Sequence, residues 1–359
     1  MAYRILVINP GSTSTKVAVY EDRQEQWSES ISHSREELAA FDGVNGQLAF
    51  RTELVKSCCR DHGERAEGFD AVVGRGGLLP PVHTGAYEVD PYMLECLRDR
   101  PQLHHASNLG APIAYAVAQE AGVKAYIYDA VAVDEMEELY RITGIRDIRR
   151  VGRGHNLNMR ASVLSLCEEK GVDYRDKNII SVHLGGGISI GLFDHGRLSD
   201  ILPDDEGPFS PERAGHLPTY SVIDWCYDVC PDKKTMLEQI QRRGGLVSHF
   251  GTADAREIEA RIHAGDAEAK LVYDAMALNI AKGIAKLSAD VCGNVDYIVL
   301  TGGISYSQYI TEAVTERVRF IAPVEIVPGE REMEALAKGA LRVLTGEETA
   351  RFLQGEEKF

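Results

Sequence analysis

The stretch RILVINPGSTSTKVAVY, residues 4–20, holds two apolar runs on either side of a turn rich in glycine and hydroxyl groups. The β-branched content of residues 3–9 and 15–20 predicts two strands joined as a hairpin. A tight turn of this composition offers backbone N–H groups and hydroxyls to one anion, and a lysine just beyond it adds positive charge. An ordinary hairpin tip with a solvated lysine is the alternative. The candidate phosphate-binding residues are Gly11, Ser12, Ser14 and Lys16.

A second stretch, NIISVHLGGGISIGLFDHGR at 178–197, has the same order of strand, small-residue turn, strand and acidic turn. This internal likeness is expected if each of two domains opens with a similar hairpin, and it predicts two related domains that face one cleft. The charged, glycine-rich segment 143–156 is where we expect the boundary. The domains are therefore predicted at 1–150 and 151–334.

Further strands and helices alternate along the chain, which indicates an α/β fold. Apolar residues recur at three- and four-residue steps over 272–291, as they do in a helix that covers one face of a sheet. Besides the hairpins, strands are expected at 69–74, 124–129 and 296–303, and further helices at 109–121 and 331–345.

The bulk composition narrows the class of protein. The chain has 359 residues and a formal charge of -16, which argues for a soluble protein and against nucleic acid as a partner. No apolar run is long enough to cross a membrane, and no signal pattern opens the chain. The 7 cysteines show no CxxC spacing, so a reducing, cytoplasmic setting is expected.

Two more glycine-rich turns follow predicted strands, in HLGGGIS (183–189) and LTGGIS (300–305). Consecutive glycines let a ligand reach the backbone, and a helix that opens after a strand favours an anion at its start. A bulge or crowded hairpin is the alternative for the first turn, and a core role is the alternative for its histidine. The candidate nucleotide-binding residues are His183, Gly185, Gly186, Gly187, Gly302 and Gly303.

Charged residues in rigid settings form the last set of candidates. Arg75 in VVGRGGLLPP and Arg213 in GPFSPERAGHLP are flanked by glycine and proline, which suits a guanidinium held for a carboxylate or phosphoryl group. A structural salt bridge is the alternative for each arginine. Asp129 follows an apolar strand, at the end where α/β sites gather, or else caps a helix. The histidine clusters at 102–112 and 152–161 match no metal spacing and suggest hydrogen-bond donors in a cleft.

Taken together, these stretches resemble the acetate and butyrate kinase family of the sugar kinase, Hsp70 and actin superfold (ribonuclease H-like). The resemblance runs through nearly the whole chain and is strongest to the butyrate kinase branch. Each block is weak alone, but the ordered series is specific. The blocks are VINPGSTSTKVAVY, GRGGLLPPVHTGAYEV, HASNLGAPIA, DAVAVDEM, HNLNMRA, VHLGGGISIGLFDHGR, DDEGPFSPERAG and LTGGIS.

The resemblance implies transfer of the γ-phosphoryl group of ATP to a carboxylate, or the reverse reaction from an acyl phosphate and ADP. It implies Mg²⁺ as cofactor, a homodimer or larger oligomer, and a C-terminal helix at about 335–359 that packs back on the first lobe. The resemblance assigns Asn9, Ser12, Ser14 and Lys16 to the family's first phosphate motif, and Arg75 and Arg213 to the carboxylate and the transition state. Either His104 or its neighbour His105 matches a family histidine, and Asp129 with either Glu332 or Glu334 matches the family's metal-associated residues. The HLGGG and TGGIS turns match further family motifs.

One segment departs from the family pattern. Butyrate kinases usually read HALNQKA where this chain has HNLNMRA, and the preceding segment, normally apolar, contains Arg150 and Arg153. The preferred acid is therefore open among butyrate, a branched short-chain acid, acetate and propionate. It is also open whether His155 takes the place of a second histidine of the family. A nucleotide-gated protein of the same superfold is the alternative from another class.

Overall fold

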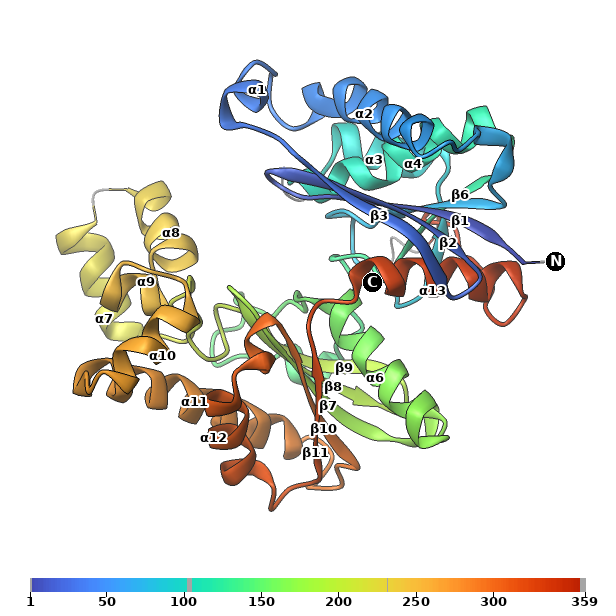
Figure 1. Ribbon diagram of the computed structural model, residues 1–359. Helices are drawn as coiled ribbons and strands as arrows, with labels where there is room; N and C mark the ends of the chain where they lie inside the picture. Colours follow the sequence, from blue (N-terminus) through green and yellow to red (C-terminus); the bar gives the residue numbers. More distant parts are fainter. Residues whose placement is uncertain (1, 102–104, 231, 356–359) are drawn as a thin grey trace. The chain divides into compact units, whose positions relative to one another are not determined.

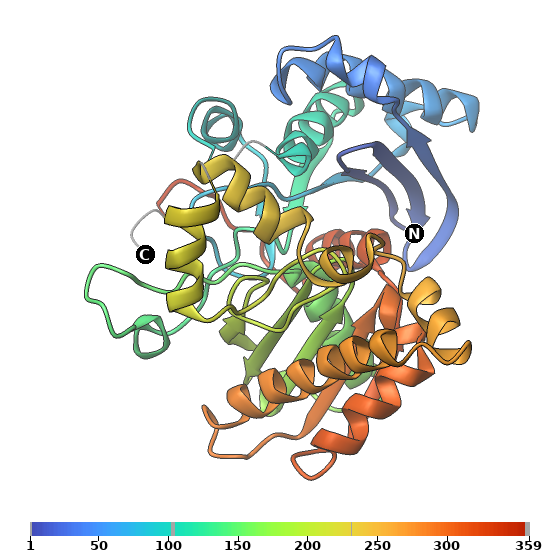
Figure 2. The same cartoon turned by 90° about the vertical axis from the view of Figure 1, so that its left-hand side faces the viewer.

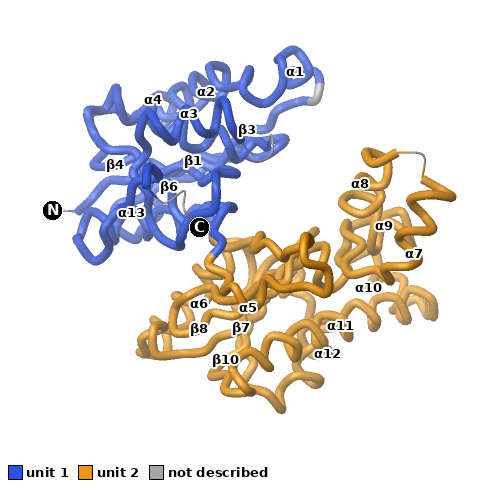
Figure 3. The backbone as a smooth tube through the Cα atoms, turned by 180° about the vertical axis from the view of Figure 1, so that it is seen from behind, with its two compact units in different colours: residues 1–134, 331–359 blue, residues 135–330 orange. Residues whose placement is uncertain are grey.

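The computed structural model describes residues 2–101, 105–230 and 232–355. The chain forms two compact units, one of residues 1–134 with 331–359 and one of residues 135–330 (Figure 3). The second unit thus begins earlier than the predicted boundary after residue 150. The physical reason is that Arg197 donates to the carbonyl of Glu135 at 2.8 Å, which joins the start of this segment to the second unit.

The sheet of the first unit has six strands in the order β3-β2-β1-β4-β6-β5 (Figure 1). Strands β1, β2 and β3 are antiparallel neighbours, whereas β4 and β6 run parallel to β1. The predicted hairpin and both further predicted strands are present. The strands are β1 (Arg4–Pro10), β2 (Ser14–Glu21), β3 (Gln24–Ser32), β4 (Ala71–Arg75), β5 (Ala86–Glu88) and β6 (Lys124–Tyr128).

Helices cover both faces of this sheet. On one face α4 packs so closely on β4 that a Cβ added to Gly74 would lie 2.3 Å from the carbonyl oxygen of Gly110. On the other face α13 packs against β6, where a Cβ added to Gly339 would lie 2.4 Å from the Tyr128 ring. The helices are α1 (Arg35–Ala39), α2 (Leu48–Asp61), α3 (Pro91–Asp99), α4 (Gly110–Ala121) and α13 (Glu332–Leu344), with short 3-10 turns at 45–47, 66–68 and 106–109.

The sheet of the second unit repeats this plan in five strands, in the order β11-β10-β7-β8-β9. Three antiparallel strands are again followed by strands parallel to the first of them. The predicted likeness between the two hairpins therefore extends to five strands of each sheet, with β5 as an extra strand of the first, as expected for two related domains. The strands are β7 (Asn178–Leu184), β8 (Ile188–Asp194), β9 (Arg197–Leu202), β10 (Tyr297–Gly302) and β11 (Val324–Pro328).

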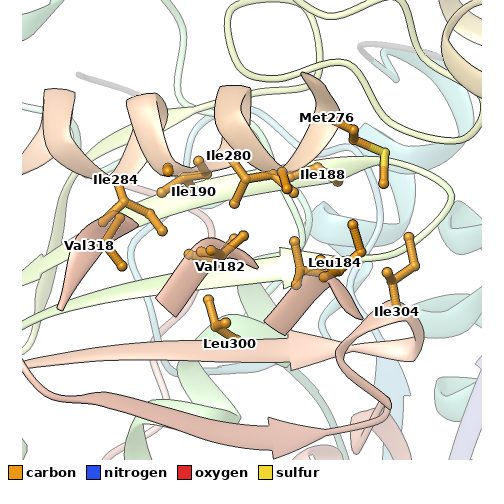
Figure 4. Packing of buried hydrophobic residues seen from close by; sticks show 14 of the residues in the cluster. Val182, Leu184, Ile188, Ile190, Met276, Ile280, Ile284, Leu300, Ile304 and Val318 are labelled. Carbon is orange, nitrogen blue, oxygen red and sulfur yellow. The ribbon is translucent and has the colours of Figure 1, made fainter. Parts of the chain in front are cut away.

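Strand β7 is buried on both faces, and each face packs against a different helix. Val182 and Leu184 face the long helix α11 (Ala267–Ser288), whose Ile280 and Ile284 are fully buried (Figure 4). The alternate residue Ser181 hydrogen-bonds at 3.2 Å to a serine of α6 (Asn156–Lys170), which covers the other face. Figure 2 shows α11 beside α12 (Gln308–Val318) along the sheet.

The remaining helices of the second unit lie at its periphery. Among the residues that the structure describes, no helix has the length and apolar character needed to cross a bilayer. The helices are α5 (Glu138–Arg141), α7 (Thr219–Asp224) with a π-helical turn (Trp225–Val229), α8 (Lys233–Arg242), α9 (Gly245–Phe250) and α10 (Ala255–His263), with 3-10 turns at 174–176 and 303–306.

Candidate active site

Three predicted site residues lie at or next to the carboxyl ends of neighbouring parallel strands in the first sheet. Asn9 is near the end of β1, Arg75 ends β4 and Asp129 directly follows β6. These strands are parallel neighbours, with Ile8 opposite Gly74 and the arginine opposite the last residue of β6. Their carboxyl ends therefore meet, at the position where α/β folds bind ligands.

A glutamate of α13 joins two of these residues. The Oε2 atom of Glu332 accepts a hydrogen bond from Asn9 Nδ2 at 2.7 Å and also pairs with Nη1 of Arg75. Its neighbour Glu334 instead forms an ion pair with Lys338, one turn along the helix, at 2.7 Å. Of the two glutamates left open by the sequence, the structure brings only Glu332 to the other candidates.

Asp129 is held by the backbone at the end of its strand. It is 3% exposed, has a φ of 41°, and accepts a hydrogen bond on Oδ1 from the N–H of Gly85 at 2.7 Å. The loop that follows it contains no helix before residue 138, so the helix-cap alternative is wrong. This hydrogen bond orients the Asp129 carboxylate at the carboxyl end of β6.

The glycines around Arg75 fix its backbone. A Cβ on Gly76 would lie 2.4 Å from the side chain of Ala130, and one on Gly77 would lie 2.7 Å from Asn108. Asn108 in turn accepts the N–H of Leu78 at 2.8 Å. These contacts leave no room for side chains, so the GRGG motif serves to position the guanidinium.

The histidine cluster next to this loop is only partly described. His104 lies outside the described residues. His105 caps the 3-10 turn Ala106–Leu109 by accepting the N–H of Ser107 on Nδ1 at 3.2 Å. Desolvation, and then the positive charge of Arg75, lower the pKa of His105, which favours the neutral ring near neutral pH. His105 therefore has a clear structural role beside the predicted substrate arginine.

The turn at Gly11 is shaped by an arginine that sequence reasoning missed. Arg51 of α2 is fully buried, and its Nη1 donates to the carbonyls of Gly11 at 2.8 Å and Ser14 at 3.1 Å. Its Nη2 lies 3.4 Å from the carbonyl of Ser12. The turn thus directs its carbonyl oxygens towards a cation, while the side chains of Ser12 and Lys16 are exposed. No helix was predicted at 48–61, and an arginine in line with the buried residues Val55 and Cys58 of such a helix is the sequence signal that could have revealed it.

In the second unit the two glycine turns lie side by side. Thr301 of β10 is opposite His183 of β7, and Gly302 packs so closely that an added Cβ would lie 2.4 Å from the carbonyl oxygen of Leu184. Gly302 has a φ of 92°, which favours glycine, whereas a Cβ on Gly303 would meet nothing within 4 Å. Gly302 thus makes the close approach, and Gly303 leaves open space.

The predicted histidines stack against each other beside the first of these turns. The rings of His155 and His183 have centroids 3.9 Å apart and planes at 10°. Nδ1 of His155 lies 3.0 Å from Oγ of Ser189, and Nδ1 of His183 lies 3.0 Å from Nδ2 of Asn158. A Cβ on Gly187 would lie 3.3 Å from the His155 ring, so the stacked pair forms one wall of the glycine turn.

The first turn is also tied to the loop that carries Arg213. The carbonyl of Gly186 accepts hydrogen bonds from Ser210 Oγ at 2.7 Å and from the N–H of Glu212 at 3.1 Å. On the other side of the loop, a Cβ on Gly245 would lie 1.6 Å from the carbonyl oxygen of Ser210. The backbone of Arg213 is therefore as closely packed as that of Arg75.

The Arg213 side chain lines a cavity of about 340 Å³ within the second unit. Its Nε donates to Asp204 at 3.1 Å and its Nη1 to Glu212 at 3.0 Å. Charged and aliphatic side chains share the remaining lining. They are Arg149, Val151, Arg153, Asp205, Glu206, Leu237 and Ile240, with Pro203 and Gln241.

The segment before His155, which departs from the family pattern, contains one arginine that anchors the backbone and others that line the cavity. Arg150 donates to Asp200 at 3.2 Å and to the carbonyl of Ile201 at 2.8 Å, and it pairs with Glu206. Arg153 is exposed and lines the cavity. Arg150 therefore anchors the segment to β9, whereas Arg149 and Arg153 line the cavity and are placed to affect a ligand.

The donor atoms at the edge of the first sheet suit a magnesium ion that arrives with a nucleotide. Asp129 and Glu332 supply carboxylate oxygens, which Mg²⁺ prefers. Within the described parts of the chain, neither belongs to a cluster of three close His, Cys, Asp or Glu donors. Mg²⁺ usually takes one or two carboxylates and completes its shell with phosphates and water, so the residues present fit this mode of binding.

Residues 124–349 match the model of the acetokinase family. The chain belongs to the acetokinase family. It is 43% identical to Butyrate kinase 2 of Clostridium acetobutylicum over 353 residues, which cover 98% of this chain and 99% of the relative. It is 44% identical to a probable butyrate kinase 2 of Caldanaerobacter subterraneus over 97% of this chain and 98% of the relative. The resemblance identified from the ordered blocks is confirmed.

The predicted fold class is confirmed as well. The acetate kinase of Porphyromonas gingivalis superimposes with a TM-score of 0.78 over 95% of this chain and 100% of its own. Its sequence identity is 21%, so this likeness shows the fold alone. The two sheets with matching strand order agree with it.

Proposed function

We propose that this member of the acetokinase family is a short-chain carboxylate kinase. It converts ATP and butyrate, or a branched acid of similar size, to ADP and an acyl phosphate. The observation that carries the proposal is the 43% identity over nearly its whole length with a butyrate kinase. The blocks that resemble the family's ATP- and acid-binding motifs follow in the family's order, with one departure at 148–156, and this supports catalysis over a merely nucleotide-gated role.

The reaction needs little covalent help from the protein. A carboxylate oxygen forms a bond to the γ-phosphorus while the bond from that phosphorus to the β,γ-bridging oxygen breaks, and ADP carries away the electron pair. Because the carboxylate is already ionised at pH 7, no general base is required. Catalysis then depends on positioning and on stabilising negative charge.

Arg75 is assigned to the carboxylate substrate. Its guanidinium already pairs with a carboxylate, that of Glu332, and the close packing of Gly76 and Gly77 holds its backbone in place. A planar guanidinium can hold both oxygens of an acid in one orientation. This would leave the acid's lone pair directed at phosphorus.

Arg213 is assigned to the transferring phosphoryl group. Asp204 and Glu212 orient its guanidinium, and the close packing of Gly245 against Ser210 restricts the backbone conformation of the loop that carries Arg213. Fixed positive charge at the equatorial oxygens lowers the barrier because no reorganisation is needed at the moment of transfer.

The glycine turns and the first hairpin are assigned to the nucleotide. Gly303, which has open space around it, and the turn at Gly187 would admit phosphate or ribose oxygens to backbone N–H groups. Exposed Lys16 and Ser12 would meet phosphate at the first hairpin. The assigned nucleotide-binding set is Asn9, Gly11, Ser12, Ser14, Lys16, His183, Gly185, Gly186, Gly187, Gly302 and Gly303.

Asp129 and Glu332 are assigned to Mg²⁺, which when bound neutralises charge on the β- and γ-phosphate oxygens. The hydrogen bond from Gly85 orients the first carboxylate, and the one from Asn9 orients the second. Assignment of Glu334 is not retained, since Lys338 pairs with it. His155 is assigned a hydrogen-bonding role towards the transferring group, oriented by Ser189.

The preferred acid depends on how the aliphatic part of the substrate is accommodated. The 43–44% identity with relatives named butyrate kinases supports an acid longer than acetate. Discrimination between neighbouring acids should be modest, because one methylene in a pocket is worth only about 1–3 kcal/mol.

The proposal includes a cytoplasmic location and a homodimer or larger homo-oligomer. All of the cysteines are free thiols, which suits a reducing compartment. Tyr220, Trp225 and Tyr227 are exposed on α7 and its π-helical turn, and aromatic residues of this kind are enriched at interfaces between subunits. Sedimentation equilibrium would test the dimer, and a monomer at micromolar protein would contradict it.

The decisive experiment is a hydroxamate assay for acyl phosphate with Mg·ATP and acids from acetate to valerate, including isobutyrate. We expect the highest kcat/KM with butyrate or a branched acid. Product from none of the acids, together with intact ATP binding, would overturn the proposal in favour of a nucleotide-gated protein.

Variants of the two arginines test the assignments. Arg213→Ala should lower kcat by roughly 10³ or more, as expected for a charge-stabilising arginine. Arg75→Ala should chiefly raise KM for the acid. The matched control is Arg175→Ala, because Arg175 also pairs with a carboxylate but is exposed. Near-normal turnover of Arg213→Ala would refute its role.

A further inference from the structure

Three potential metal ligands meet at the outer edge of the first sheet, on residues that the proposed function does not use. Glu29 lies on β3, the edge strand, while Cys58 and His62 lie at the last turn and the C-terminal cap of α2. Nε2 of the histidine is 2.9 Å from Oε2 of the glutamate, and Sγ of the cysteine is 3.6 Å from the same oxygen. One ligand atom from each residue lies within 4.8 Å of the others.

We propose that Glu29, Cys58 and His62 form a binding site for Zn²⁺, with water as the fourth ligand. Thiolate sulfur, imidazole nitrogen and carboxylate oxygen are the three ligand types that zinc takes in proteins, and sets of three protein ligands plus water are usual for open sites. Magnesium is a hard cation that avoids sulfur, so the proposed nucleotide-bound Mg²⁺ would not compete.

The spacing of the donor atoms fits a tetrahedral ion after a small adjustment. Zinc–ligand distances of about 2.0–2.3 Å place tetrahedral donors roughly 3.3–3.8 Å apart. The sulfur–oxygen distance of 3.6 Å lies in this range, and the nitrogen–oxygen distance of 2.9 Å has to lengthen. The Glu29 side chain is 49% exposed on an edge strand, so rotation of this carboxylate can provide the change.

The histidine ring is oriented by its neighbours. Trp27 stacks on His62 with ring centroids 4.0 Å apart and planes at 12°. The indole is held by a hydrogen bond from Nε1 to Glu64 at 2.9 Å, and Glu64 in turn pairs with Arg4 at 2.6 Å. This chain of contacts presents Nε2 to the ligand position before any ion arrives, which reduces the cost of ordering the ring on binding.

The thiol supplies a chemical signature for binding. The Cys58 side chain is buried, and its S–H donates to Oε2 of Glu29 at 3.6 Å. Zinc binding forms the metal–sulfur bond and releases this proton to solvent. Access is available because the ring of His62, at 34% exposure, borders the buried sulfur.

Such an ion would fasten the free edge of the sheet to the helix that carries Arg51. Metal binding would then stabilise α2 and β3 together, by mass action on the folded state. Because the ligands are remote in sequence from the candidates for ATP and acid binding, loss of the ion should leave the chemistry of phosphoryl transfer intact.

The experiment titrates the purified full-length protein with Co²⁺ and then Zn²⁺, without nucleotide. We expect one equivalent of Co²⁺ to give a thiolate-to-metal charge-transfer band that Zn²⁺ abolishes, and calorimetry in buffers of different ionisation enthalpy to show proton release. Cys58→Ser should remove the band. Glu29→Gln and His62→Gln should weaken Zn²⁺ binding by at least the roughly 10–100-fold that losing a ligand's hydrogen-bond partner causes.

Two cysteine variants serve as controls. Cys59→Ser changes the buried neighbour on the same helix, and Cys292→Ser changes an exposed thiol of the second unit; both should keep the band. Circular dichroism establishes that each variant is folded, and Glu29→Gln, on the exposed edge, tests the site even if Cys58→Ser fails to fold. No charge-transfer band in the parent protein, or a band that survives Cys58→Ser, would overturn the proposal. Hydroxamate activity is a separate readout, so failure of the metal site and failure of the kinase function are distinguishable.

Discussion

Replacing Arg51 by methionine should weaken both the fold and nucleotide binding. The guanidinium donates to the carbonyls of Gly11 and Ser14 and to Thr15 Oγ1 at 2.8–3.1 Å, and its Nε donates to Gln47 at 3.0 Å. Methionine keeps much of the packing but none of these hydrogen bonds. Each acceptor left unsatisfied in a buried position costs about 1–3 kcal/mol.

The three acceptors of the hairpin turn set the expected size of the effect. Their summed cost would be about 3–9 kcal/mol. The turn borders exposed residues, so water can replace some of the bonds, and the cost should lie in the lower half of this range. We expect a loss of about 3–5 kcal/mol in the free energy of unfolding of the first unit.

Urea unfolding followed by circular dichroism measures the stability, and ATP titrations in the hydroxamate assay measure the kinetic effect. At a temperature where the variant is folded, KM for ATP should rise while KM for the acid changes little. Arg60→Met, at an exposed position of the same helix, is the control and should alter neither quantity. Stability within 1 kcal/mol of the parent (about the net value of one hydrogen bond), or an unchanged KM for ATP, would refute the reasoning.

Three further changes test the glycine turn, a half-buried carboxylate and the glutamate of α13. Gly302→Ala should destabilise the second unit by about 1–3 kcal/mol, because φ is 92° and the new methyl would lie 2.4 Å from the Leu184 carbonyl oxygen; urea unfolding measures this. Burial and the negative charge of Asp200 raise the pKa of Asp290 to about 6, so its stabilising effect is present at low pH and is lost as pH rises through about 6. Asp290→Asn should therefore increase stability above pH 6, by on the order of 1 kcal/mol, and flatten this part of the pH profile. Glu332→Gln should raise the Mg²⁺ concentration needed for half-maximal activity roughly 10–100-fold, measured by Mg²⁺ titration.

Each of these changes has a matched control. Gly303→Ala places a methyl where nothing lies within 4 Å and should leave stability unchanged. Glu169→Gln removes an exposed carboxylate and should not alter the pH profile, and Glu334→Gln should leave the Mg²⁺ requirement as it is. A pH profile that keeps its slope in Asp290→Asn would contradict the assignment of that slope to the half-buried carboxylate of Asp290.

The local parts of the fold could be predicted because apolar periodicity and turn composition act over a few residues. The hairpin at 4–20 and the long helix of the second unit are examples, and the helix is only shifted, to Ala267–Ser288. The strand end also placed Asp129 where α/β sites gather, whereas the position of Arg75 opposite the last residue of β6 is known only from the structure. Strand β5, with only Ala86–Glu88, was missed because so short a run carries no periodicity.

The partners of the candidate residues could not be predicted, because they come from distant parts of the chain. Nothing near Asn9 in the sequence indicates that Glu332 of the C-terminal helix completes its hydrogen bond, or that Glu334 turns to Lys338. Arg51 was missed for the same reason. A buried arginine is explained only by the carbonyls that surround it, and these belong to a different element.

The glycines show how close packing and ligand access are divided within one motif. Gly302 and Gly303 are adjacent and looked equivalent in the sequence, yet the first contacts the Leu184 carbonyl and the second has open space around its Cα. Gly76 and Gly77 are both of the packed kind, and the residue that they position is Arg75. Within a glycine-rich motif, a glycine with open space around it therefore indicates where a ligand can approach the backbone, whereas a packed glycine positions its neighbours. By this criterion Gly303 is the position at which a larger side chain should block nucleotide binding while leaving the fold intact.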